Sequence, residues 1–395
     1  MLPVPPADRT PEIRALFPYL AQRIYLDTAA AGICWQGHGA AVARFYEEVK
    51  NRGYDARPEW WAMIDKVRTR LAQWLGAAPE DITFVSNTTE GLNLAAHSLQ
   101  FRAGDRIVCA EDEFPSVARI WRNAEQAGAQ VVRVRIPREE DRQACLMAAA
   151  VHGTRVLAVS HTHSGTGTTL DLAALGRHCR RRGTLLMVDG IQALGAVPVD
   201  LGLVDIYASS FFKWMLSGFG FGVLVTSARA REAMVPAWQG YANMDDAGQL
   251  QYAHVNTPAL YGLDATLDVL ESIGWDTIHA RVRALGERLI AEADRHGLDL
   301  VTPRDQHAGI FVFRAPDGEA VRQQLAARGI CVAARNLKRV QQRDPPGCSL
   351  KQEESGAELR SAEEEACRKE RLEVDLVVGS TWEKPCSAAD VQNGS

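Results

Sequence analysis

"TLLMVDGIQALGAVPVDLGLVDIYASSFFKWMLSGFGFGVLVT" spans Thr184 to Thr226 and contains the short β-rich runs TLLMVD, VDIYASS and GFGVLVT. Upstream of it, the similar runs DITFVS, DRIVCA, QVVRVRI and TRVLAVSH alternate with helical stretches. Strands that alternate with helices favour a mostly parallel sheet with helices on both faces. The sequence therefore predicts an α/β protein, in which ligands bind outside the carboxyl ends of the strands.

Lys213 follows one of these runs and has apolar neighbours in the sequence, among them Phe211, Phe212, Trp214 and Met215. Loss of hydration disfavours the charged form of a lysine, so its pKa falls toward the range in which the free amine is a nucleophile. Such an amine can form a Schiff base. The alternative is a lysine whose stem packs on the aromatic rings while its ammonium group reaches water.

Two other strand ends carry polar groups. Thr88 and Thr89 precede a helix predicted to start near Glu90, where hydroxyls and free backbone N–H groups would make a cradle for a phosphate. The alternative is that one of these threonines simply caps the helix. Asp189 ends an apolar strand, where a carboxylate is costly unless it meets a cation or good donors. The alternative there is an Asx turn with Gly190.

These strand ends together match the needs of one cofactor. Pyridoxal phosphate requires an anion site for its phosphate, a carboxylate that keeps its pyridine nitrogen protonated, and a lysine for its aldehyde. The occurrence of all three at carboxyl ends of strands favours a shared cofactor site over separate structural roles. The sequence therefore predicts a pyridoxal phosphate site built around Lys213.

The sequence gives little support for binding to nucleic acid or membranes. Lys plus Arg number 44 against 49 Asp plus Glu, the net charge is −5, and no basic stripe with interleaved aromatics occurs, so we expect no nucleic-acid partner. Charged residues interrupt the longest apolar region, which argues against a membrane partner. The N-terminus lacks the basic start and apolar run of a targeting signal, so we expect a cytoplasmic protein.

Metal and dinucleotide sites are not predicted either. The eight cysteines form no CxxC pair, and HTH at His161–His163 has no further histidine and carboxylate set at ligand spacing. GFGFG at Gly218–Gly222 leads into a strand rather than a helix, so it does not fit the dinucleotide fingerprint.

Composition divides the chain of 395 residues into segments. We expect an N-terminal segment over 1–23, a large domain over 24–258, a smaller α+β domain over 259–336 and a divergent charged tail over 337–395. The tail is interpreted as one charged helix in a weakly ordered segment, with a short apolar run near Leu372 to Val378. In the large domain, the spacing of apolar residues predicts an amphipathic helix over Glu59–Leu75 that ends at Gly76.

Several motifs, in one order along the chain, resemble those of the class V aminotransferase family of fold type I pyridoxal phosphate enzymes. That family includes cysteine desulfurases, kynureninases and isopenicillin N epimerase-like proteins. The motifs are IYLDTAAAG, VSNTTEGLNLAA, DEFPSV, VSHTHSGTGTTLDL, VDGIQALGAVPVDL, ASSFFKWMLSGFGFGVL and NTPALYGLDATLDVLESIG. The resemblance covers roughly Ile24 to Arg335, and it implies an amino-acid substrate and a homodimer.

The resemblance also implies roles for single residues. Lys213 would form the internal aldimine, Asp189 would pair with the pyridine nitrogen, and Gln192 would lie near the ring oxygen. The remaining set is expected as follows: Thr88, Thr89 and Ser210 at the phosphate, Phe114 stacked on the ring, Ser164 in the position of the desulfurases' asparagine, Asn256 and Thr257 toward the partner's phosphate, and Arg335 as the candidate for the substrate carboxylate.

The sequence also departs from the family pattern. Phe212 stands where the family usually has a histidine or tyrosine that helps to hold the phosphate. Phe114 lies in the EFPS form, which is more frequent in the kynureninase and epimerase-like branches than in the desulfurases. The family's closing motifs, an arginine-containing stretch and a YNT stretch, do not follow Arg335.

The leading hypothesis is an enzyme that forms an external aldimine with an amino acid and labilises a bond at its α-carbon, with Lys213 as the proton-transfer base. A lyase of desulfurase or kynureninase type is favoured, with an aminotransferase or an amino-acid epimerase as alternatives. From a different class, the alternative is a pyridoxal phosphate-binding protein that has lost catalysis through its altered C-terminus.

Overall fold

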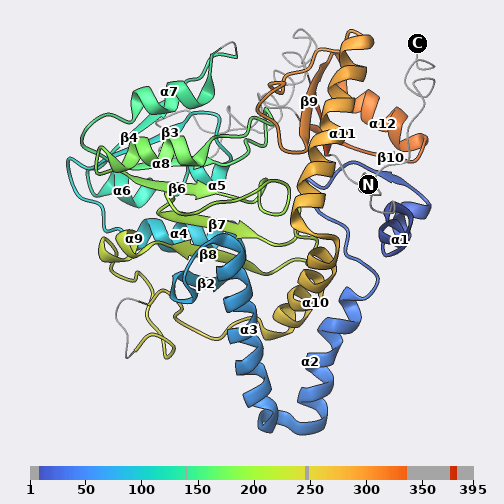
Figure 1. Ribbon diagram of the computed structural model, residues 1–395. Helices are drawn as coiled ribbons and strands as arrows, with labels where there is room; N and C mark the ends of the chain where they lie inside the picture. The colour runs from blue at the N-terminus through green and yellow to red at the C-terminus, as the bar shows by residue number, and fades with distance from the viewer. Residues whose placement is uncertain (1–8, 139, 245–248, 336–373, 380–395) are drawn as a thin grey trace, which may run out of the picture.

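The computed structural model describes residues 9–138, 140–244, 249–335 and 374–379 (Figure 1). Its centre is a seven-stranded sheet. The strands are β2 (Ile82–Val85), β3 (Arg106–Ala110), β4 (Gln130–Val134), β5 (Thr154–Ser160), β6 (Leu185–Asp189), β7 (Ile206–Ser210) and β8 (Gly222–Thr226). They lie in the order β2-β8-β7-β6-β5-β3-β4. All neighbours pair in parallel except β8, which is antiparallel to β7 and β2. The predicted mostly parallel sheet is confirmed.

Helices bury both faces of this sheet. Val188 of β6 belongs to a core that it shares with α3, α7, α8 and α10, whereas the preceding Met187 belongs to a second core with α4, α5, α6 and α9. Strands buried on both faces read as continuous apolar runs, which explains the sequence pattern. The helices are α3 (Arg57–Leu75), α4 (Thr88–Ser98), α5 (Pro115–Ala118), α6 (Arg122–Gln126), α7 (Arg142–Ala149), α8 (Leu172–Arg180), α9 (Ala228–Glu232) and α10 (Thr257–Ile273).

Two helices near the N-terminus project from the body as a long hairpin (Figure 1). They are α2 (His38–Arg52) and α3, joined by the short 3₁₀ helix Gly53–Ala56. The helix predicted over Glu59–Leu75 is confirmed, because α3 ends at Leu75 and Gly76 follows with φ of 64°. The base of the hairpin is tied to α10, where the Thr266 hydroxyl receives a hydrogen bond from Trp35 Nε1 at 3.1 Å.

Smaller elements surround the second, C-terminal part of the chain. A parallel pair joins β1 (Ile24–Tyr25) to β10 (Ile330–Cys331), so the chain's start contacts its small α+β region. The remaining elements are α1 (Thr10–Ala15), the 3₁₀ helices Pro18–Ala21 and Pro79–Asp81, α11 (Trp275–Arg295), β9 (Ile310–Ala315), α12 (Gly318–Ala327), β11 (Ala333–Arg335) and β12 (Val374–Gly379).

The apolar run in the charged tail forms a strand. β12 lies between β9 and β11 and is antiparallel to both. The charged helix and the weakly ordered segment expected over 337–395 stay a prediction. The other residues of that tail lie outside the described residues. The division of the chain at residues 23, 258 and 336 stays a prediction.

The topology brings several strand ends to one edge of the large sheet. Because β8 is antiparallel to both of its neighbours, β2 runs in the same direction as β7 and the parallel strands. The carboxyl ends of β2, β3, β5, β6 and β7 therefore share an edge. Ser160 and Asp189 are the last residues of β5 and β6, and the segments that follow β2, β3 and β7 carry Thr88, Phe114 and Lys213. Ligands of α/β sheets bind at such an edge.

Candidate active site

A pocket of about 150 Å³ opens at this edge of the sheet. Most of the residues predicted from the sequence to form a cofactor site line it: Thr88, Thr89, Phe114, Ser164, Asp189, Gln192, Ser210 and Lys213. Sequence reasoning missed other lining residues, namely Asn87, Ser116, Ser160, Thr162, Ile191 and Phe212 as a pocket wall. The missed hydroxyl residues stand directly at strand or helix ends, which is the signal that could have identified them.

Lys213 lies in the loop after β7, and its side chain is buried, with 8% of the residue exposed. Burial disfavours the ammonium form and lowers the pKa of Lys213 to about 8, although the negative charge of Asp189 works in the opposite direction. The backbone of the loop is fixed: Gly32 N–H donates to the Phe212 carbonyl at 2.8 Å, and Leu216 N–H donates to the Lys213 carbonyl at 3.1 Å. The lysine is thus held as a buried amine and does not reach out to solvent.

Asp189 is the last residue of β6 and is 4% exposed. Its Oδ1 accepts a hydrogen bond from Ile191 N–H at 3.0 Å, so the Asx turn considered from the sequence does form. Burial nevertheless raises the pKa of Asp189 to about 6, against the effect of this hydrogen bond and of the Lys213 charge. The carboxylate therefore both shapes the turn and faces the pocket.

Hydroxyl groups gather where α4 begins. Thr88 N–H donates to Ser210 Oγ at 2.8 Å, Ser210 N–H donates to Thr88 Oγ1 at 2.9 Å, and the two hydroxyl oxygens are 2.9 Å apart. Thr89 Oγ1 lies 2.7 Å from Ser116 Oγ. The cap of α4 is neither threonine but Asn87, whose side chain accepts from Glu90 N–H at 2.9 Å. The threonines are therefore not used as the helix cap that the sequence allowed.

The other lining residues surround these groups. Gln192 is buried and clamped, because its Nε2 donates to the Ala29 carbonyl at 2.9 Å and its Oε1 accepts from Trp214 Nε1 at 3.0 Å. Phe114, which precedes α5, is 43% exposed at the pocket. Phe212 lines the pocket and stacks on the exposed Phe219 with ring centroids 4.5 Å apart.

Three predicted site residues lie away from the pocket lining. Asn256 Nδ2 donates to the Gly220 carbonyl at 3.1 Å, and Thr257 is buried at the start of α10. Their predicted role concerns a second copy of the chain. Arg335 ends β11, and its positive charge contributes to lowering the pKa of Lys213 after burial. The structure thus brings Arg335 within electrostatic range of the lysine but gives it no place in the wall.

Asp27 was not singled out from the sequence, although it lies in the IYLDTAAAG motif. Burial raises its pKa, while Arg335 and Lys213 lower it. Among the described residues, Asp27 Oδ1 and Thr28 Oγ1 are buried without a hydrogen-bond partner. The segment that carries them continues to Ala29, whose carbonyl accepts the Gln192 hydrogen bond, and to Gly32, which contacts the Lys213 loop.

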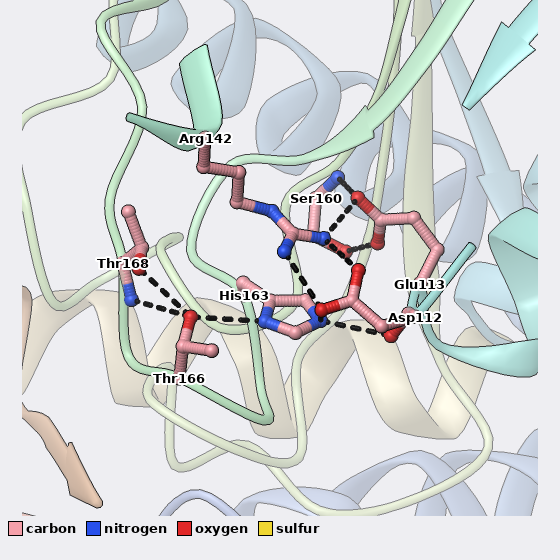
Figure 2. A network of polar contacts seen from close by, with 7 residues as sticks. All are labelled: Asp112, Glu113, Arg142, Ser160, His163, Thr166 and Thr168. Atoms are coloured by element: carbon pink, nitrogen blue, oxygen red, sulfur yellow. Dashed lines mark hydrogen bonds and ion pairs between the residues drawn. The ribbon is translucent and has the colours of Figure 1, made fainter. Parts of the chain in front are cut away.

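A buried polar network adjoins the pocket (Figure 2). Its residues are Asp112, Glu113, Arg142, Ser160, His163, Thr166 and Thr168. Glu113 Oε2 accepts from the Ser160 hydroxyl at 2.5 Å, so the network reaches the pocket lining directly. The sequence analysis considered the HTH motif for metal binding and as part of a family motif, but not as part of a buried network. Within the described ranges, no group of three or more His, Cys, Asp and Glu could hold a metal ion.

The residues present fit pyridoxal phosphate. The pocket offers a buried amine with a lowered pKa, a buried carboxylate facing it, and a cluster of hydroxyls at the N-terminus of α4, which suits an anion. Fold and pocket together define a fold type I pyridoxal phosphate enzyme. The chain belongs to the class V aminotransferase family, whose model matches residues 24–335, and this confirms the resemblance carried by the motifs.

The chain's relatives include an isopenicillin N epimerase and cysteine desulfurases. The chain is 37% identical over 286 residues to isopenicillin N epimerase of Amycolatopsis lactamdurans, which covers 64% of this chain and 71% of that protein. It is 30% identical over 309 residues to a cysteine desulfurase of Dickeya dadantii, with 70% and 73% covered. A solved structure of a cysteine desulfurase from Thermococcus onnurineus superposes with a TM-score of 0.78 at 20% identity, covering 96% of this chain and 94% of that one. No helix in the described part of the chain is long and apolar enough to cross a membrane.

Proposed function

We propose that the chain is a pyridoxal phosphate-dependent enzyme that labilises a bond at the α-carbon of an amino acid, as a lyase of desulfurase or kynureninase type. The observation that carries this proposal is the convergence of Lys213, Asp189 and the Thr88–Ser210 hydroxyl pair on one pocket. Each group alone has an ordinary structural explanation. Their common orientation toward one small cavity has none that we find.

Each residue has a defined task in this proposal. Lys213 would supply the amine for the cofactor's aldehyde, and Thr88, Thr89 and Ser210 would hold its phosphate with their hydroxyls. Asp189 would pair with the pyridine nitrogen. Gln192, which Trp214 holds, would lie near the ring oxygen. When bound, the cofactor supplies an electron sink that stabilises negative charge developing at the substrate's α-carbon.

Proton transfer falls to Lys213. A general base works best when its pKa is near the working pH, and burial moves the Lys213 amine from its usual 10.5 to about 8. The amine can therefore take a proton from the substrate's α-carbon and release it again close to neutral pH.

A second candidate is epimerisation of an amino acid. It is favoured by the 37% identity to an isopenicillin N epimerase, and Phe114 in the EFPS form suits this branch as well as a kynureninase-type lyase. The two candidates differ in product: a lyase releases a fragment of the side chain, whereas an epimerase returns the substrate with inverted configuration. Chiral chromatography of the product mixture distinguishes them.

The test of the proposal is the visible absorption spectrum of the purified protein with pyridoxal phosphate, before and after borohydride, beside Lys213→Ala. We expect a visible band in the wild-type protein, removed irreversibly by borohydride, and no such band in the variant. An unreduced band, or an equal band in Lys213→Ala, would contradict the role of Lys213. A further spectral shift on adding amino acids separates an enzyme from a protein that only binds the cofactor.

We also infer that the chain works as a homodimer. Exposed aromatic residues support this: Phe219 is 70% exposed next to the pocket wall, and Tyr54 and Trp61 on the α2–α3 hairpin are 67% and 53% exposed. Large apolar groups exposed near a site are typical of surfaces that a partner covers. Light scattering after size-exclusion chromatography should give twice the chain mass, and a monomer would contradict the inference. The cytoplasmic location stays a prediction.

A further inference from the structure

Arg142 is an arginine buried beside the proposed cofactor pocket but not part of its lining. It begins α7, and its side chain is 5% exposed. Its guanidinium binds Asp112 at both oxygens, with Nη1–Oδ2 of 2.9 Å and Nη2–Oδ1 of 2.7 Å (Figure 2). Burial alone would raise the pKa of Asp112, but the Arg142 guanidinium lowers it. This two-point contact fixes the direction in which the Asp112 backbone continues.

The next carboxylate in the chain depends on the same arginine. Glu113 has a side chain that is fully buried, and its Oε1 lies 3.4 Å from Arg142 Nη2. The other contacts of Glu113 are with Ser160, whose main-chain N–H donates at 3.1 Å and whose hydroxyl donates at 2.5 Å. A buried carboxylate is costly without a cation and donors, and here Arg142 and Ser160 supply them.

This arrangement reaches the pocket at two points. Phe114 follows Glu113 directly in the chain and lines the pocket. Ser160 also lines it, and on the sheet it is paired in register with Asp189. The negative charge of Glu113 adds to burial in raising the pKa of Asp189. Arg142 therefore affects the positions of the lining residues Phe114 and Ser160. It also compensates the charge of Glu113, which acts on the lining residue Asp189.

A second brace holds the same segment through its backbone. His163 Nε2 lies 2.9 Å from the Asp112 carbonyl, so this nitrogen carries the proton and donates. His163 Nδ1 lies 3.0 Å from Thr166 Oγ1, in the loop that also contains Ser164 (Figure 2). Side-chain and backbone contacts thus tie two pocket-lining loops together.

We propose that Arg142 is a positioning residue of the cofactor pocket: its contacts with Asp112 and Glu113 hold Phe114 and Ser160 in place, and its charge compensates that of Glu113 beside Asp189. This inference rests on the proposed function, because it concerns how the pocket receives pyridoxal phosphate. Arg142 touches neither cofactor nor substrate and acts through its neighbours.

The experiment compares Arg142→Gln and Arg142→Lys with wild-type protein. The matched control is Arg155→Gln, which breaks a partly buried contact with Asp105 far from the pocket. Affinity for pyridoxal phosphate is measured by fluorescence titration, and unfolding of the apoprotein is followed in urea. We expect Arg142→Gln to bind the cofactor about tenfold more weakly, because Phe114 and Ser160 are then no longer held in place for it, and Arg155→Gln to lose stability but not affinity.

The pH midpoint of the visible band distinguishes a positioning role of Arg142 from a general loss of stability. Asp189 and Lys213 are the charged groups that line the pocket, and the charges of Glu113, Asp27 and Arg335 shift the pKa of one or the other. Removing the positive charge of Arg142 leaves Glu113 uncompensated, so the pH at which the visible band of bound cofactor titrates should rise. The double variant Arg142→Gln/Glu113→Gln should bring that midpoint back toward the wild-type value.

The outcomes are distinct. If Arg142→Gln folds, and its cofactor affinity and the titration midpoint of its visible band equal those of wild type, the Arg142 inference is overturned. The proposed function then still stands. If Arg142→Gln does not fold, Arg142→Lys decides, since it keeps the charge and loses the two-point contact: weaker binding with an unchanged midpoint supports positioning, and wild-type binding overturns it. A wild-type protein that forms no visible band overturns the proposed function, and this inference with it.

Discussion

Asp189 and Lys213 face one buried pocket, and burial shifts the pKa of each toward that of the other. The carboxyl rises to about 6 and the amine falls to about 8. The charge of each partner limits the shift of the other, since a carboxylate favours an ammonium nearby and the reverse. The pocket thus holds an acid and a base whose titrations bracket neutral pH, which suits proton transfer.

The lowered pKa of Lys213 predicts how fast apoprotein takes up pyridoxal phosphate at different pH. Only the neutral amine attacks an aldehyde, so the rate of appearance of the visible band should rise with pH to a midpoint near 8 and not near the ordinary value of 10.5. Stopped-flow absorbance measures this rate. In Asp189→Asn the midpoint should fall further, because a charge that favours the ammonium is lost. A wild-type midpoint near 10.5 would contradict the buried position of the amine.

The raised pKa of Asp189 predicts a gain in stability when its charge is removed. Between pH 3.8 and about 6 the folded protein holds this proton more tightly than the unfolded chain, so the contribution of Asp189 to stability falls as pH rises through that window. The free energy of unfolding of Asp189→Asn apoprotein should therefore exceed that of wild type at pH 7, by at most about 3 kcal/mol. This difference should disappear toward pH 4.

Urea unfolding of apoprotein at the two pH values measures this difference. Asp189→Asn also removes a negative charge near Lys213, which makes the gain in stability smaller. The gain should still increase with pH. Asp65→Asn, at an exposed carboxylate on α3, is the matched control and should change stability little at either pH. Equal effects of Asp189→Asn at both pH values would show that the Asp189 carboxyl titrates normally.

The hydrogen bonds of the buried, uncharged Gln192 side chain should contribute to stability. Gln192→Leu leaves the Ala29 carbonyl and Trp214 Nε1 without their partner in a buried region, which should cost about 1–3 kcal/mol. Gln130→Leu, at an exposed glutamine that accepts from Arg106 at 3.1 Å, should change stability by less than about 0.5 kcal/mol. Thermal or urea unfolding of the apoproteins compares the two, and similar losses would mean that the Gln192 clamp contributes nothing specific.

The strands and the central lysine could be predicted from sequence because burial on both faces leaves continuous apolar runs. Every such run named upstream of Thr226 became a strand of one sheet. The reversed direction of β8 could not be predicted, since GFGVLVT has the same composition whether it pairs parallel or antiparallel. β12 also escaped prediction, because its run is short and surrounded by charged residues, and only pairing with β9 and β11 defines it.

The site was predictable where single residues follow strands. Asp189 and Lys213 stand out because a charge beside an apolar run is unusual. Arg142 and Glu113 did not stand out, since their pairing joins residues far apart in the chain and each looks like an ordinary charged residue locally. Asn87 was missed as the cap of α4 because the adjacent threonines are equally good caps by type, and only backbone geometry selects among them.

At Gly32 the N-terminal loop packs so closely on the Lys213 loop that there is no space for a side chain. A Cβ at this position would lie 2.1 Å from the Lys213 carbonyl oxygen and 2.7 Å from Leu216 Cδ2, and the backbone atom cannot move away cheaply. Gly32→Ala should therefore destabilise the apoprotein by about 1–3 kcal/mol and weaken cofactor binding, because the lysine loop must shift. Gly39→Ala is the control: nothing lies within 4 Å of a Cβ there, and alanine in α2 should be neutral or slightly stabilising. Urea unfolding and fluorescence titration with pyridoxal phosphate measure both effects, and a Gly32→Ala protein that matches Gly39→Ala in both would show that the two loops do not pack as described.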